Sequence, residues 1–82
     1  MLDKKEEKAL VDKAKSGDQD SFMKLEFGAR EKVWNSLIRL MKDEFKAQDV
    51  YQQGTIKAWN KIESFKGESR FGTWLYRICF NL

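Results

Sequence analysis

Apolar residues recur three or four residues apart along most of the chain, which is the spacing of an α-helix. No segment alternates apolar and polar residues with a period of two, and the sequence contains no proline. The pattern predicts helices over residues 4–16, 19–42, 46–62 and 70–82. We therefore expect an all-α fold, in which residues 1–82 form one compact bundle of about four helices.

Residues that start and stop helices support these boundaries. The first helix ends at Ser16-Gly17, where glycine suits a left-handed position. Asp18 is a candidate N-cap for the second helix. A loop over residues 63–69 joins the third and fourth helices, and Ser69 is a candidate N-cap for the fourth.

The predicted core consists of the inward-facing residues of the four apolar stripes. They are Leu10, Val11, Ala14, Phe22, Leu25, Ala29, Val33, Leu37, Leu40, Ala47, Val50, Gly54, Ala58, Ile62, Phe71, Trp74, Leu75 and Ile78. Gly54 and Ala58 are small, so a neighbouring helix could approach the third helix closely there.

The composition excludes most enzymatic chemistry. There is no histidine and only one cysteine, Cys79, so neither a thiolate–imidazole zinc site nor a Ser–His or Cys–His nucleophile is available. We expect no enzyme, no metal and no cofactor. A lone cysteine, no N-terminal apolar signal and no apolar run of ~18–20 residues favour a cytoplasmic protein without a membrane segment.

Positive charge and aromatic residues are concentrated in the second half of the chain. The net charge is +3, and residues 1–44 contain ten basic and ten acidic side chains. Residues 45–82 contain six basic and three acidic side chains, together with eight of the eleven aromatic residues. A basic, aromatic half beside a neutral half indicates a surface that faces a polyanion.

The last eighteen residues divide into a core face and a candidate nucleic-acid-binding surface. Helical spacing puts the apolar side chains of the fourth helix on one face and donors for phosphates and base edges on another. The preceding loop supplies the aromatic and polar groups of a base-sized pocket. The candidate residues are Phe65, Lys66, Gly67, Glu68, Ser69, Arg70, Thr73, Arg77 and Asn81. The alternative is an ordinary solvated helix surface beside a loop whose glycine permits a turn.

The third helix carries a second candidate surface, away from its predicted core side. Asp49, Gln52, Gln53 and Ile56 follow one another at helical spacing. Polar residues on such a face are usually only solvated, but an isolated isoleucine among them suits a contact with another protein.

The chain resembles the conserved helical domain of bacterial sigma factors, sigma region 2, and most of all that of the extracytoplasmic-function group. The resemblance is carried by residues 49–54, residues 58–59, residues 65–78 and Asn81. Its most specific part is Phe-x-Thr-Trp-Leu-Tyr-Arg-Ile after a Phe-Lys-Gly-Glu-Ser loop. Residues 10–25 fit the opening helices of the same family, so the resemblance covers nearly the whole chain.

The resemblance implies a transcription initiation factor domain. In this family the domain binds the clamp helices of the RNA polymerase β′ subunit and recognises the promoter −10 element. It helps to melt the duplex by capturing flipped non-template bases. By position, Asp49, Gln52 and Gln53 would face the polymerase, and residues 65–69 would shape the pocket for the flipped base. The residues expected along the non-template strand are Arg70, Thr73, Arg77 and Asn81.

Some positions depart from the family pattern. Gln53 stands where glutamate is usual, which weakens an ionic contact with the polymerase, and Thr55 stands at a usually apolar and aromatic position. Glu26 and Ala29 replace common tyrosines. The chain stops at Leu82, in mid-helix by the family pattern, and the −35-reading second domain is absent, so we expect a fragment of a longer factor.

The expected partners are the RNA polymerase core and the non-template strand of −10 promoter DNA, with an anti-sigma factor as a further candidate. Outside the polymerase complex we expect a monomer. The main alternative is a helical interaction module that binds a regulator such as an anti-sigma factor and has little DNA binding of its own. A duplex-reading helix-turn-helix is disfavoured, because no short polar recognition helix is visible.

Overall fold

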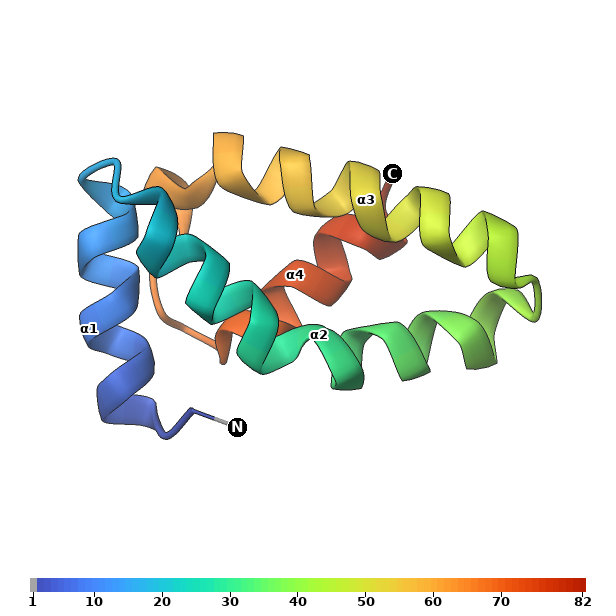
Figure 1. Cartoon of the computed structure of the whole chain (residues 1–82), viewed down its shortest axis with the longest axis horizontal. Coiled ribbons are helices and arrows are strands. Elements are labelled where there is room, and N and C mark those ends of the chain that lie inside the picture. The colour runs from blue at the N-terminus through green and yellow to red at the C-terminus, as the bar shows by residue number, and fades with distance from the viewer. Residues whose placement is uncertain (1) are drawn as a thin grey trace.

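The computed structural model describes residues 2–82 and confirms an all-α fold. It contains α1 (Lys4–Lys15), α2 (Gln19–Met41), α3 (Glu44–Asn60) and α4 (Phe71–Phe80), with a short 3-10 helix, η1 (Ile62–Ser64), after α3 (Figure 1). No strand occurs in residues 2–82, and no helix in this part of the chain has the length and apolar character to cross a bilayer.

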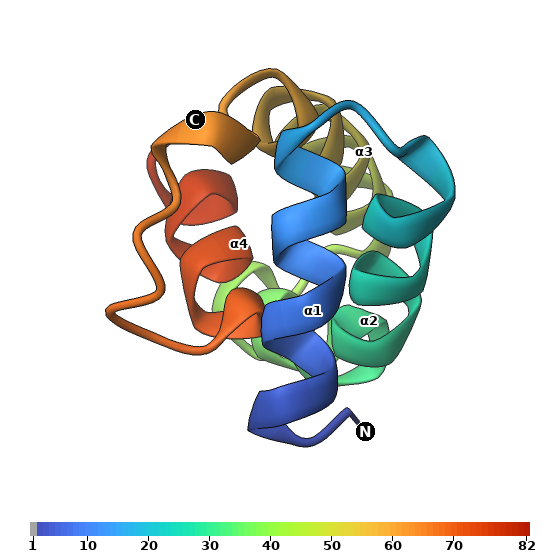
Figure 2. The same ribbon diagram turned by 90° about the vertical axis from the view of Figure 1, so that its left-hand side faces the viewer.

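The two longest helices, α2 and α3, run in opposite directions, and α4 packs against both (Figure 1). At the end of the bundle where α2 begins, α1 lies crosswise and contacts α2 and η1 (Figure 2). The segment between η1 and α4 passes beside α1, so the N-terminal helix and the loop of residues 65–70 share one end of the molecule.

The third helix has different boundaries from those predicted. It begins two residues earlier, because Asp43 is its N-cap and accepts a hydrogen bond from the backbone N–H of Lys46 at 3.1 Å. Lys42 ends α2 in a left-handed conformation (φ 53°), which leaves a very short connection. At the other end, residues 61–62 are outside α3, and Ile62 reaches the core from η1.

The turn between α1 and α2 follows the prediction. Gly17 has a φ of 101°, in the region that favours glycine. Asp18 occupies the N-cap position of α2, but its carboxylate accepts a hydrogen bond from the hydroxyl of buried Ser21 at 2.6 Å and makes none to a backbone N–H.

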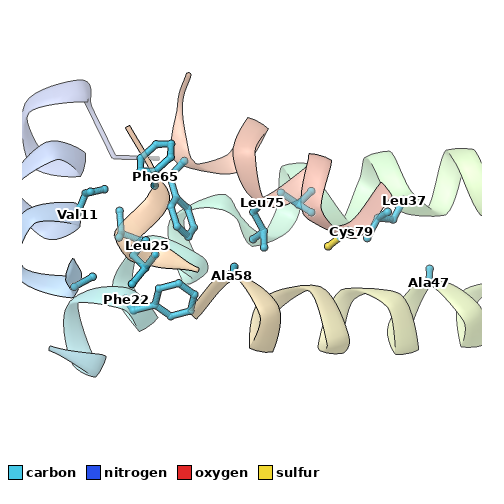
Figure 3. Packing of buried hydrophobic residues seen from close by; sticks show 13 residues of the cluster. Val11, Phe22, Leu25, Leu37, Ala47, Ala58, Phe65, Leu75 and Cys79 are labelled. Carbon is cyan, nitrogen blue, oxygen red and sulfur yellow. The ribbon is translucent and has the colours of Figure 1, made fainter. Parts of the chain in front are cut away.

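The buried core lies between all four helices, as Figure 3 shows. Its members are Val11, Ala14, Phe22, Leu25, Val33, Leu37, Ala47, Ala58, Ile62, Phe65, Phe71, Leu75 and Cys79. The prediction for Leu40 is wrong, because its side chain is 52% exposed. The inner stripe of α2 passes instead from Leu37 to Met41, four residues further on, which packs against the core.

Aromatic rings join the loop to the helices. The ring of Phe65 lies 4.9 Å from that of Trp74 and 6.2 Å from that of Phe71, between centroids. The Phe71 ring continues the cluster to Phe22 at 5.7 Å, and Phe22 reaches Trp59 at 5.3 Å. These offset and edge-on pairs add to the energy of burial, so the start of the loop is anchored in the core.

Helices α3 and α4 approach closely at Gly54, as the small residue predicts. A β-carbon at this position would lie 2.2 Å from the Sγ atom of Cys79. The thiol is buried against the glycine, and this burial raises the pKa of Cys79 to about 11. Cys79 is therefore a protonated packing residue at neutral pH.

Candidate nucleic-acid interface

The loop of residues 65–70 begins at a buried side chain. Phe65 is only 4% exposed, because its ring packs against Phe71 and Trp74. The ring therefore lies at the base of the loop, as a fixed aromatic group beside the exposed residues that follow it. Lys66, Gly67 and Glu68 are exposed, and Gly67 has a φ of 73°, so the loop turns outward immediately after its anchor.

The loop ends at a hydrogen-bonded cap that comes from α1. The Oε2 atom of Glu7 accepts a hydrogen bond from the backbone N–H of Phe71, the first residue of α4, at 3.1 Å. The prediction of Ser69 as the N-cap of α4 is wrong, since Arg70 occupies that position and the Ser69 hydroxyl instead faces the Arg70 carbonyl at 3.2 Å. A carboxylate at a helix N-terminus satisfies a free N–H and favours the helix dipole.

The guanidinium of Arg70 is engaged inside the protein. Its Nε atom lies 3.2 Å from both carboxylate oxygens of Glu7, and its Nη2 atom donates to the carbonyl of Leu2. The Glu7 side chain is 14% exposed and that of Arg70 is 38% exposed. Arg70 thus ties the N-terminal segment and α1 to the start of α4, a role that its expected place on a DNA-facing stripe did not predict.

A groove of about 570 Å³ separates α1 from the loop. The loop contributes residues 65–70, so the first six candidate residues come together at this groove. The opposite wall belongs to α1, and its lining residues are Lys4, Glu7, Lys8, Val11, Asp12 and Lys15. The groove therefore has a buried aromatic ring in its lining and mostly charged side chains around it, a mixture that suits a nucleotide.

The remaining candidate residues lie along α4, outside this groove. Thr73 and Arg77 are exposed on α4, and Asn81 is exposed at its C-cap. Within residues 2–82, no carboxylate lies within ion-pair distance of Arg77. This face extends the polar surface away from the loop and leaves one cation available to a ligand.

The predicted face of α3 is exposed at all four positions. Asp49, Gln52 and Gln53 are solvated, and Gln53 donates a hydrogen bond to Asp49 at 3.0 Å. Ile56 is 59% exposed. It borders a shallow, mainly apolar groove of about 310 Å³ between α2 and α3, which Met23 also lines. Exposed apolar side chains beside polar ones are typical of a protein-binding surface.

Glu26, which departs from the family pattern, belongs to a polar network beside this groove. Glu26 accepts two hydrogen bonds from Arg30, at 2.6 and 2.8 Å, and one from the hydroxyl of Tyr51 on α3. Burial alone would raise the pKa of Glu26, but these hydrogen bonds lower it. Burial and the bond to Glu26 raise the pKa of Tyr51. Glu26 thus links α2 to α3 with its charge satisfied.

The described chain is thus a small all-α domain with a mixed-charge groove at one end and an exposed polar and apolar face on α3. Comparison with known families gives a specific match. The sigma-70 region 2 family matches residues 29–82. The chain belongs to the sigma-70 region 2 family.

Curated relatives agree with this assignment over almost the whole chain. RNA polymerase sigma-H factor of Pseudomonas aeruginosa is 37% identical over 81 residues, which are 99% of this chain and 42% of that protein. ECF RNA polymerase sigma-E factor of Haemophilus influenzae is 41% identical with the same coverage. ECF RNA polymerase sigma factor SigW of Bacillus subtilis is 35% identical over 75 residues, 92% of this chain and 40% of that protein. The chain thus spans about two fifths of the length of these relatives.

Proposed function

We propose that this chain is a transcription initiation domain that binds RNA polymerase through α3 and single-stranded promoter DNA through the loop and α4. Family membership supports the general role. The observation that carries the assignment of surfaces is the groove between α1 and residues 65–70, with exposed Thr73, Arg77 and Asn81 on the adjoining helix. The DNA ligand in this proposal is the non-template strand of the −10 element, and the polymerase ligand is the β′ clamp-helix coiled coil.

The energies favour capture of an open strand over active unwinding. Opening a duplex costs about 1.4 kcal/mol per stacked step. A stacked or pocketed base contributes roughly 1–3 kcal/mol. One groove of this size can therefore hold an exposed base and bias the open state, while opening of a whole bubble requires the polymerase.

Within the proposed site, Phe65 keeps the pocket role that the sequence predicts, while the role of Arg70 differs from the expectation. The ring of Phe65 would form a fixed part of the base pocket, since it is held by Phe71 and Trp74. Arg70 would shape the loop by binding Glu7, while Lys66 and Arg77 supply the cations that reach a strand.

The first prediction concerns the form of DNA that binds. In fluorescence anisotropy at low salt, the chain is expected to bind a −10-like single strand more tightly than the matching duplex, because only an unpaired base can enter the groove. Arg77→Ala is expected to weaken this binding, since it removes a cation without a partner in residues 2–82. Equal affinity for duplex and single strand, or no binding to either even with polymerase present, would contradict the proposal.

The second prediction separates the two surfaces. Asp49→Arg is expected to abolish co-purification with RNA polymerase core and to leave single-strand binding unchanged, because Asp49 lies on α3 away from the groove. Glu31→Arg is the matched control, as it reverses the charge of an exposed acid on α2. If Asp49→Arg loses both activities while circular dichroism shows an intact fold, the two-surface assignment is wrong.

The exposed apolar side chains of Met23 and Ile56 favour a second candidate function, a module that binds a regulatory protein such as an anti-sigma factor. In that case, partner binding would persist in variants of Arg70, Arg77 and Asn81, and no single-strand preference would be measured.

A further inference from the structure

The groove beside the loop has a second wall that the proposed base pocket leaves without a role. Lys4, Lys8 and Lys15 of α1 follow one another at intervals of four and seven residues, so they share one stripe of the helix. All three line the groove opposite residues 65–70. A row of cations along one wall is the arrangement that follows the backbone of a nucleic acid strand.

The charges in the groove leave these lysines available. Glu7 forms an ion pair with Arg70 and accepts a hydrogen bond from the backbone N–H of Phe71, so its charge is already compensated within the protein. Lys8 pairs with Asp12 at 3.3 Å, but both side chains are more than 60% exposed. Such an exposed pair contributes little stability, so Lys8 can exchange its partner for a phosphate at small cost.

Four lysines then remain in the groove against two carboxylates. Lys66 adds a cation from the loop side, while Asp12 and Glu68 are the acids that Arg70 does not neutralise. A lysine is a flexible point charge that binds phosphate without a fixed geometry. The volume of about 570 Å³ is in the range of sites for small ligands, so a nucleotide segment fits between the walls.

We propose that Lys4, Lys8 and Lys15 bind the phosphates of the single strand whose base the loop captures, so that α1 forms the second wall of one strand-binding groove. This inference rests on the proposed function of the loop. The bonds of Glu7 to Arg70 and Phe71 hold α1 beside the loop, so the two walls keep a fixed separation and can act on one ligand together.

The helix provides its own matched control. Lys5 and Lys13 are exposed on α1 but do not line the groove. The experiment compares Lys4→Gln/Lys8→Gln with Lys5→Gln/Lys13→Gln in the 82-residue chain. The probe is a fluorescein-labelled oligodeoxythymidylate of about twelve nucleotides, titrated by anisotropy at several KCl concentrations.

In the groove pair, two phosphate contacts are lost. The slope of log affinity against log salt concentration is therefore expected to become shallower by about 1.4, and binding at about 0.1 M KCl to weaken roughly tenfold. The control pair should keep the slope and affinity of the unmodified chain. If circular dichroism shows that the groove pair is less folded, Lys15→Gln alone is compared with Lys13→Gln, and its slope should be flatter by about 0.7.

Equal losses of affinity in the groove pair and the control pair would show an effect of net charge alone and would overturn the inference. Unchanged binding in both pairs would also overturn it, while leaving the loop's proposed function intact. Failure of that function is seen separately, because the unmodified chain would then bind no single strand before any variant is compared.

Discussion

Replacing Gly54 by valine is expected to lower the free energy of unfolding by about 3 kcal/mol, the upper part of the range for overpacked cores. A β-carbon at Gly54 would lie 2.2 Å from Sγ and 3.3 Å from Cβ of Cys79, and the branched side chain of valine would crowd this side of α4 further. Rotation of the thiol would relieve only the first contact, so α3 and α4 would have to separate. A chain of this length has a total stability of roughly 4–12 kcal/mol, and urea unfolding followed by circular dichroism measures the loss.

Gly28→Ala is the control for this prediction. Among residues 2–82, a β-carbon at Gly28 meets only the flexible side chain of Leu2, at 3.3 Å. Alanine is favoured over glycine in a helix by about 1 kcal/mol. Gly28→Ala should therefore keep much of this gain and should not destabilise the fold. Cys79 is the only thiol in the sequence and is buried, so Gly54→Val should also speed its reaction with a thiol reagent. Unchanged stability and unchanged thiol reactivity would show that the helices tolerate a wider spacing.

Helical periodicity predicts most of this fold, because the side chains of one stripe either meet a neighbouring helix or remain in water. The stripes of α1 and α4 place Val11, Ala14, Phe71 and Leu75 in the core correctly. Leu40 shows the limit of the method. At the end of a long helix, spacings of three and four residues both continue the stripe, and only the position of the neighbouring helices selects Met41.

The candidate site was less predictable, because its geometry depends on contacts between distant parts of the chain. The loop composition predicts a turn at Gly67 and exposed polar groups, and both are present. Nothing in the sequence marks Glu7 as the cap of a helix that begins 64 residues later. A local N-cap at Ser69 was the natural expectation, because sequence patterns report only caps that come from neighbouring residues. The burial of Phe65 likewise follows from rings on α4, which local spacing does not place.

Replacing Glu7 by alanine is expected to lower the free energy of unfolding by about 1–2 kcal/mol. Loss of a helix cap costs typically about 1 kcal/mol, and the partly exposed Arg70 would lose its charged partner, which adds a smaller amount because solvent screens it. The same change frees the end of the loop from α1. Backbone amides of residues 66–69 should then exchange hydrogen faster, and single-strand affinity should fall in protein that is still folded.

Glu7→Gln separates the two contributions of this carboxylate. The amide oxygen of glutamine can still accept the N–H of Phe71, but it no longer carries a charge for Arg70, so less than half of the stability loss is expected. Glu63→Gln is the matched control, since Glu63 is exposed on η1 and, within residues 2–82, has no ion-pair partner. If Glu7→Ala lowers stability but leaves loop exchange and strand affinity of the folded protein unchanged, Glu7 only supports α4. If loop exchange and strand affinity both change along with stability, and Glu7→Gln has a smaller effect on each of the three, Glu7 holds the loop in the conformation that binds the strand.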